Sequence, residues 1–205
     1  MFVTDSSDYH VLTEAVNMIK DVEGATFEIG LREGGGSWHI MEALVATQQN
    51  SSKMHVAIDP YGDIEYKMDP GAPYKWNPGW YTDKMRNETM SKMYAYVQEK
   101  NIKFQFFNLE STEFFARYAD GIPVYDTQKQ LVNKYSLVHF DGAHTFEAVL
   151  SEVMFFHPRT NPGAVFVFDD VGGWYSHDVI HQALEKLNWE KCIDSFSKWA
   201  YVKKV

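Results

Sequence analysis

Four residues suited to metal binding and proton transfer come directly after two short apolar runs of the chain. Asp141 follows the first run and precedes His144 by three positions, and Asp169 and Asp170 follow the second run. Carboxylates that converge repel one another unless a positive charge lies between them. Asp141, Asp169 and Asp170 are therefore candidate ligands for Mg²⁺ or Ca²⁺, which would also lower the pKa of bound substrate oxygens. The alternative is a helix cap or ligand-amine contact at Asp141 and a solvated turn at 169–170.

A second group of residues, in segment 25–37, is suited to binding. An apolar run with strand propensity leads into a loop whose small residues are Gly30, Gly34, Gly35, Gly36 and Ser37. Glycines let the backbone turn sharply and touch a ligand, and the start of the following helix offers free N–H groups. A phosphate-binding P-loop needs a lysine where Gly36 stands, and a dinucleotide loop needs a glycine where His39 stands. What remains is an acid, Glu28, followed by spaced glycines, with a plain glycine turn as the alternative.

A further acid and an unusual insertion follow the next apolar run. Asp59 ends that run, where an acid can bond both ribose hydroxyls of an adenosine; the alternative is that Asp59 only starts a turn. Residues 60–81 then hold four prolines, three glycines and six tyrosines or tryptophans. Long irregular loops of this kind are usually functional. We expect an aromatic lid over a substrate, with Tyr61 near the ligand, or a subunit interface that would make a homo-oligomer.

The elements that must position these groups alternate between helix and strand. Apolar periodicity predicts helices at about 8–22, 37–49, 83–100, 111–118, 126–134, 145–156 and 176–187. Strands are predicted at about 25–29, 55–58, 102–107, 137–140, 164–168, 189–195 and 199–203. This alternation predicts a parallel sheet with helices on both faces, whose ligands bind at the carboxyl ends of the strands. The candidate residues all lie at such ends.

Length and composition limit the classes of protein. With 205 residues and 45% hydrophobic residues, we expect one globular domain spanning 1–205. The net charge of −9 argues against broad nucleic-acid binding, which needs a basic surface. No apolar stretch reaches the roughly 20 residues of a membrane span, and no signal peptide is visible. Together with the single cysteine, Cys192, this predicts a cytoplasmic protein.

Four segments together resemble the class I S-adenosylmethionine (SAM) dependent methyltransferases. They are FEIG…GGS at 27–37, IDPYG at 58–62, VHFDGAHTF at 138–146 and FVFDDV at 166–171. The third and fourth are similar to the small bacterial and phage-type branch that contains macrocin-type sugar O-methyltransferases and cephalosporin-hydroxylase-like proteins. The resemblance implies a Rossmann-like, doubly wound, mostly parallel seven-stranded sheet with the last strand antiparallel. It also implies SAM as cofactor and Mg²⁺ on Asp141, Asp169 and Asp170.

The resemblance also assigns roles around the cofactor. Glu28 would hold the amino-acid end of SAM, and Ser111 would touch adenine, unless Ser111 only caps its helix. The cofactor-binding set is then Glu28, Gly30, Gly34, Gly36, Ser37, Asp59, Tyr61, Ser111 and Asp141. In the sugar enzymes an acid often stands two residues after the first aspartate as the base, but here that residue is Ala143. His144, beside Asp141, becomes the nearest candidate base, with a structural cap or an aspartate-bound histidine as the alternative.

These observations predict a SAM-dependent methyltransferase that acts on a hydroxyl of a small molecule, with a sugar as one candidate. A rival from another class is a binding or assembly protein on a methyltransferase-like scaffold, which Ala143 supports. An NAD-linked sugar enzyme is a third reading, disfavoured by the incomplete dinucleotide loop.

Overall fold

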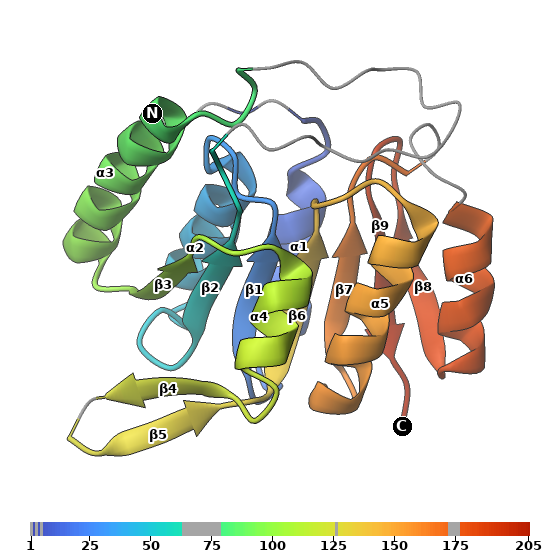
Figure 1. Cartoon of the computed structure of the whole chain (residues 1–205). Coiled ribbons are helices and arrows are strands. Elements are labelled where there is room, and N and C mark those ends of the chain that lie inside the picture. Colours follow the sequence, from blue (N-terminus) through green and yellow to red (C-terminus); the bar gives the residue numbers. More distant parts are fainter. Residues whose placement is uncertain (1, 3, 5, 63–78, 126, 172–176) are drawn as a thin grey trace.

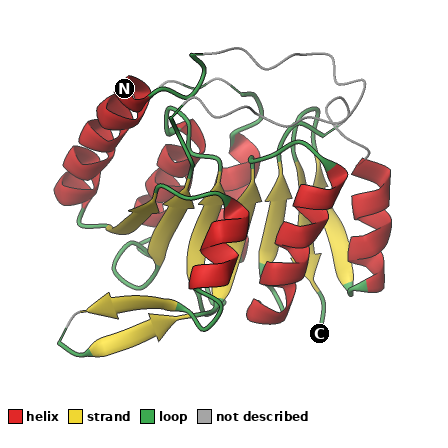
Figure 2. Cartoon of the chain, viewed as in Figure 1, coloured by secondary structure: helices red, strands yellow, loops and turns green. Residues whose placement is uncertain are grey.

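The protein folds around one seven-stranded sheet with helices on both faces (Figures 1 and 2). The structure is a computed structural model, and it describes residues 2, 4, 6–62, 79–125, 127–171 and 177–205. The strand order is β3-β2-β1-β6-β7-β9-β8. Within the described residues, no helix is long and apolar enough to cross a membrane.

Five strands of the sheet run parallel. They are β1 (Ala25–Ile29), β2 (Met54–Ile58), β3 (Lys103–Phe107), β6 (Tyr135–Phe140) and β7 (Val165–Phe168). The final hairpin is formed by β8 (Trp189–Asp194) and β9 (Trp199–Lys203), and β9 lies antiparallel between β7 and β8. The predicted mostly parallel sheet with an antiparallel last strand is confirmed.

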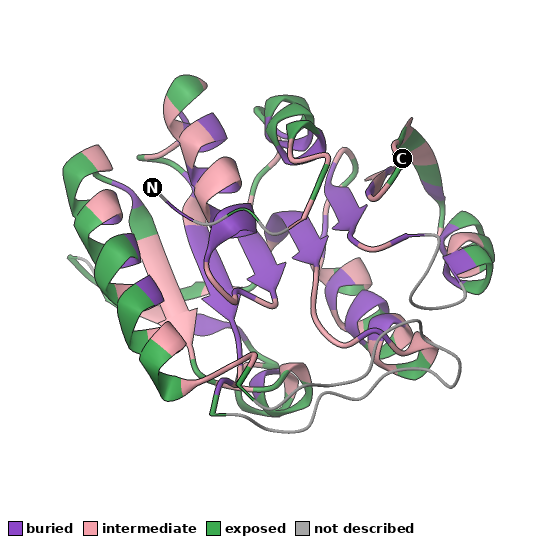
Figure 3. Cartoon of the chain, turned by 90° about the horizontal axis from the view of Figure 1, so that it is seen from above, coloured by how far each residue is buried: buried purple, intermediate pink, exposed green. Residues whose placement is uncertain are grey.

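Among the described residues, three helices cover each face of the sheet. One face carries α1 (His10–Met18), α2 (Gly35–Ala46) and α3 (Asp83–Lys100). The other carries α4 (Ser111–Arg117), α5 (Phe146–Phe156) and α6 (His177–Lys186), with the short 3₁₀ helix η1 (His157–Arg159) after α5. Seen along the strands, the central part of the sheet is buried between these two layers (Figure 3).

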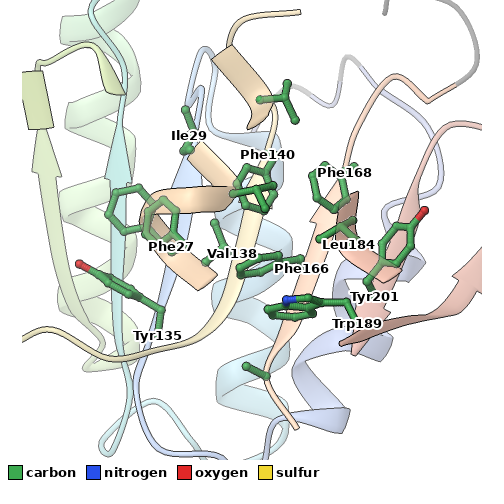
Figure 4. Close-up of a cluster of buried hydrophobic side chains, with 14 of the residues drawn as sticks. Phe27, Ile29, Tyr135, Val138, Phe140, Phe166, Phe168, Leu184, Trp189 and Tyr201 are labelled. Carbon is green, nitrogen blue, oxygen red and sulfur yellow. The ribbon is translucent and has the colours of Figure 1, made fainter. Parts of the chain in front are cut away.

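The central strands are rich in apolar residues on both faces because both of their faces are covered. All five residues of β1 and all six of β6 are buried. Aromatic rings fill the layer under α4, α5 and α6, where Phe27 packs against Phe114 and Phe156. In the same layer Phe140 stacks on Phe168 (Figure 4). Truncating one such ring to alanine typically lowers the free energy of unfolding by about 3–5 kcal/mol. This layer therefore stabilises the sheet whose carboxyl ends form the site.

The helix predicted at 126–134 is wrong. The chain there forms an antiparallel hairpin of β4 (Ile122–Tyr125) and β5 (Lys129–Val132), at the end of the molecule opposite the carboxyl ends of the parallel strands (Figure 1). Segment 129–132 is too short and too exposed to bury a helical face, so its backbone pairs with the neighbouring strand instead.

Two predicted helix starts also need correction. The first helix occupies only His10–Met18 of the expected 8–22. Ser37 does not cap α2, because the helix begins at Gly35 and Gly34 is the capping residue, in a left-handed conformation. Ser37 lies inside the first turn, where its hydroxyl is free to bond a buried side chain.

The topology creates a crevice between β1 and β6. From β1 the chain continues to β2 and β3 on one side, and it returns through β6 and β7 on the other. Ligands of such sheets bind where the strand order reverses, at the carboxyl ends of the strands.

Candidate cofactor and catalytic site

A cavity of about 710 Å³ opens at this reversal point. Its volume lies in the range of small-molecule sites. It is lined by many of the predicted site residues, namely Gly30, Gly36, Asp59, Tyr61, Ser111, Asp141, His144, Asp169 and Asp170. The sheet therefore brings together, on one edge, residues that are far apart in the sequence.

Two glycines of the loop are required by close approach of other groups. Gly30 has φ +88°, and a side chain there would overlap the backbone carbonyl of Asp141 on the neighbouring strand. A side chain at Gly36 would overlap the carboxylate of Glu28 and press on the ring of His139. These positions are closed to other residues because the loop lies directly on the strand ends.

Glu28 lies beneath the loop. It is 1% exposed, accepts a hydrogen bond from the Ser37 hydroxyl, and places Oε1 2.8 Å from His139 Nδ1. Burial raises the pKa of Glu28 to about 8, while its hydrogen bonds with Ser37 act in the opposite direction. Glu28, Gly34 and Ser37 are not among the residues that line the cavity. They support the loop, and their direct contact with a cofactor stays a prediction.

Asp59 ties the end of β2 to the loop after β1. Its Oδ2 accepts hydrogen bonds from the backbone N–H groups of Leu31 (3.0 Å) and Arg32 (2.8 Å), and its Oδ1 from that of Tyr61 (3.1 Å). Burial raises the pKa of Asp59 to about 6, and these backbone hydrogen bonds oppose the shift. Asp59 is thus a loop anchor that also lines the cavity. Tyr61 completes the anchor by donating its hydroxyl to the Arg32 carbonyl.

The acid cluster formed by Asp141, Asp169 and Asp170 contains a buried cation that we did not predict. Lys198 is fully buried and its Nζ lies 2.6 Å from Asp169 Oδ2. The same ammonium donates to the Ser6 hydroxyl at 2.7 Å, and Ser6 in turn donates to Asp169 Oδ1 at 3.1 Å. Lys198 thus supplies part of the positive charge that converging carboxylates require. A single lysine just before β9 carries no sequence signal that would have revealed this role.

The other members of the cluster form a group of their own. Asp141, His144 and Asp170 each offer a ligand atom within 4.8 Å of the others, and His144 Nε2 lies 2.8 Å from Asp170 Oδ2. Burial raises the pKa of Asp141 well above its usual range, with Asp169 adding to the shift and Lys198 opposing it. Two carboxylates and one imidazole fit a divalent cation that accepts mixed oxygen and nitrogen ligands. Asp169 is held by Lys198 instead, so its role as a metal ligand stays a prediction.

Ser111 and the aromatic insertion also meet the cavity. Ser111 is the first residue of α4, and the capping position is taken by Glu110, so the helix-cap alternative for Ser111 is not what the structure has. Trp80 and Tyr81, at the end of the insertion, line the cavity together with Tyr61. Residues 63–78 of the expected lid lie outside the described residues.

The sequence pattern of the methyltransferase domain family matches residues 27–171, a segment that begins within β1, ends just after β7 and includes the predicted site residues. The chain belongs to the methyltransferase domain family. Membership of this family implies SAM as the methyl donor. Among curated proteins, no significant match to the sequence was found.

Solved structures of methyltransferases share the fold. The calicheamicin methyltransferase CalS11 aligns with a TM-score of 0.70 at 13% identity, over 95% of this chain and 78% of CalS11. The O-methyltransferase NovP aligns with a TM-score of 0.62 at 13% identity, over 96% of this chain and 79% of NovP. A putative caffeoyl-CoA O-methyltransferase from Staphylococcus aureus aligns with a TM-score of 0.54 at 12% identity, over 98% of this chain and 85% of that enzyme. At these identities the likeness concerns the fold alone.

Proposed function

We propose that this methyltransferase domain binds SAM in the cavity and transfers its methyl group to a hydroxyl oxygen of a small molecule. The observation that carries the proposal is that one cavity of about 710 Å³ is lined by two different groups of residues. One part of it has the glycine loop and Asp59, which suit an adenosine with an amino-acid tail. Another part has Asp141, His144 and Asp170, which suit a hydroxyl that must lose its proton.

SAM, when bound, supplies a methyl group already activated by its sulfonium. The task of the chain is then to align the acceptor and to remove its proton. We assign proton acceptance to the His144 imidazole. The Asp170 carboxylate, 2.8 Å from Nε2, orients the ring and stabilises its protonated form. With SAM bound, its methyl group would pass to the acceptor oxygen and S-adenosylhomocysteine would be left, while His144 would take the acceptor proton.

The acceptor is proposed to be small and hydroxylated. Trp80 and Tyr81 present aromatic groups to the cavity, and such groups suit the faces of a sugar or an aromatic ring. CalS11 is also described as a TDP-rhamnose 3'-O-methyltransferase, which makes sugars the first acceptors to screen.

A divalent cation held by the carboxylates of Asp141 and Asp170 is part of the proposal, and it leaves the His144 imidazole available as the base. Calorimetry with Mg²⁺ and Mn²⁺ tests it without any turnover. Asp170→Asn should abolish the binding isotherm, whereas Asp178→Asn, on the exposed surface of α6, should leave it unchanged. Equal binding by both variants would remove the metal from the proposal and leave a mechanism that rests on the base alone.

The function itself is tested by ligand binding. SAM or its demethylated product, S-adenosylhomocysteine, should bind with a Kd in the low micromolar range, about −8 kcal/mol, and NAD should not. Asp59→Asn should weaken binding by about 1–3 kcal/mol through lost charged hydrogen bonds, and Asp120→Asn, in an exposed turn, should not. Binding of NAD without binding of SAM would refute the proposal.

A non-catalytic binding protein remains the second candidate, because Ala143 lies in the cavity wall where the sugar enzymes often have an acid. Its signature would be tight product binding without turnover of any hydroxylated acceptor.

A further inference from the structure

Glu152, on α5, is a buried carboxyl group that the proposed mechanism does not use. It is 1% exposed and lines the same cavity, yet neither of its oxygens has a hydrogen-bond partner among the described residues. Its Oε1 lies 3.7 Å from the place where a Cβ of Gly142 would stand, so the carboxyl lies against the loop that follows β6. Buried polar atoms are nearly always paired, and an unpaired carboxyl inside a cavity indicates a missing ligand atom.

The chemical form of this group limits what it can bind. Burial raises the pKa of Glu152 to about 8, and the side chain of Ser111 opposes the shift without completing a hydrogen bond. At neutral pH the group is then mainly an uncharged acid. An uncharged acid presents one O–H donor and one C=O acceptor side by side.

We propose that Glu152 recognises the adenine base of SAM, accepting a hydrogen bond from the 6-amino group and donating one to ring nitrogen N1. The inference rests on the proposed function, because it assigns one part of the SAM molecule to one part of the same cavity. Leu109 and Ala148 offer apolar contact to the faces of the ring. Ser111 is a second polar group at its edge.

The order of the strands decides which part of SAM reaches Glu152. Asp59 follows β2 and Ser111 follows β3, whereas Asp170 follows β7, on the far side of β1 and β6. With the ribose at Asp59, the base extends toward Ser111, and the sulfonium toward Asp141 and the reacting oxygen. Ser111 is the polar neighbour that acts on Glu152, which places this acid at the base end of the cavity.

The test is a thermodynamic cycle in which the Glu152 carboxyl group and the 6-amino group of the ligand are removed separately. Binding of S-adenosylhomocysteine, and of its analogue lacking the 6-amino group, is measured by calorimetry for the full chain and for Glu152→Leu and Glu152→Gln. The wild type should bind S-adenosylhomocysteine about 10-fold more tightly than the analogue, because one buried hydrogen bond is lost. Glu152→Leu should bind S-adenosylhomocysteine about 10- to 100-fold more weakly and no longer distinguish the two ligands.

Two controls make the result specific. Glu152→Gln keeps a donor and an acceptor at the same place and should retain binding within about threefold. Glu14→Leu, on the exposed face of α1, should change neither affinity. If Glu152→Leu weakens both ligands equally, or weakens neither, Glu152 does not read the base and the inference is overturned. If the wild type binds no S-adenosylhomocysteine at all, the proposed function fails first, which is a different result.

Discussion

Among the charged residues of the site, Lys198 is the one whose replacement should lower the free energy of unfolding most. The change considered is Lys198→Met. Methionine keeps the length of the side chain and removes the ammonium that lies 2.6 Å from Asp169 Oδ2. Asp169 would keep its hydrogen bonds from Ser6 and from the Asp170 backbone, both to Oδ1. Its Oδ2, however, would lose the ammonium and keep only the ring of His139 nearby, with Nε2 at 4.0 Å.

The size of the effect follows from the burial of both partners. Lys198 and Asp169 are 0% and 1% exposed, and removing one partner of a buried ion pair typically costs about 3–5 kcal/mol. For a chain of this length, 1 kcal/mol shifts Tm by about 2–4 °C, so a fall of about 6–20 °C is expected. Thermal and urea unfolding at pH 7, followed by circular dichroism, measure it directly.

Lys204→Met is the matched control. Lys204 pairs with Glu190, but the side chains are 51% and 59% exposed, so losing this pair should cost less than about 1 kcal/mol. If Lys198→Met is as stable as Lys204→Met, the ammonium does not stabilise the acid cluster. Lys198→Met should also bind Mn²⁺ more tightly than the wild type, because one positive charge has left the neighbourhood of Asp141 and Asp170.

Three further changes are expected to act on separate parts of the structure. Gly36→Ala should destabilise the fold by about 2 kcal/mol or more and abolish S-adenosylhomocysteine binding, because its methyl group would overlap the Glu28 carboxylate. Urea unfolding measures the first effect and calorimetry the second. Normal binding by this variant would contradict the tight contact. The pKa of Glu152 rises from 4.5 to about 8 on folding, so its contribution is full below pH 4.5 and is lost as pH rises through 8. Glu152→Gln should therefore reduce the loss of unfolding free energy between pH 5 and 8.5, by up to about 4 kcal/mol, and an unchanged slope would refute the shift. Thr145→Ala should cost about 1 kcal/mol in urea unfolding, because the Thr145 hydroxyl caps α5 by accepting from the Ala148 N–H, and Thr13→Ala on the exposed face of α1 is its control.

The regular part of the fold could be predicted from local patterns. The buried parallel strands are short segments rich in apolar residues. The helix predicted at 83–100 has those bounds in the structure. The hairpin at β4 and β5 could not be predicted, because its strands have four residues each and only one of these residues is buried. Short exposed segments carry no periodicity from which to tell helix from strand.

The site was predictable only where a residue's place in the topology fixes its role. Asp59, Asp141 and Asp170 lie at the sheet edge because each follows a parallel strand. Lys198 and Glu152 were missed, because a lysine before a strand and a glutamate in a helix are ordinary in any sequence. Their importance arises from burial and from missing or close partners, which only the packed structure reveals.

The contacts of Ser6 and Asp8 have a consequence for how the protein is made. Asp8 accepts a hydrogen bond from the Ser197 backbone N–H across 189 positions of sequence, and Ser6 meets Lys198 across 192. A ribosome synthesises these partners many seconds apart, at about 5–20 residues per second. During the last part of that interval, after Asp141, Asp169 and Asp170 have been made, the nascent chain holds these acids without the lysine that balances them. The sheet can assemble strand by strand as it emerges, but its acidic edge can reach its final charge balance only when residue 198 arrives.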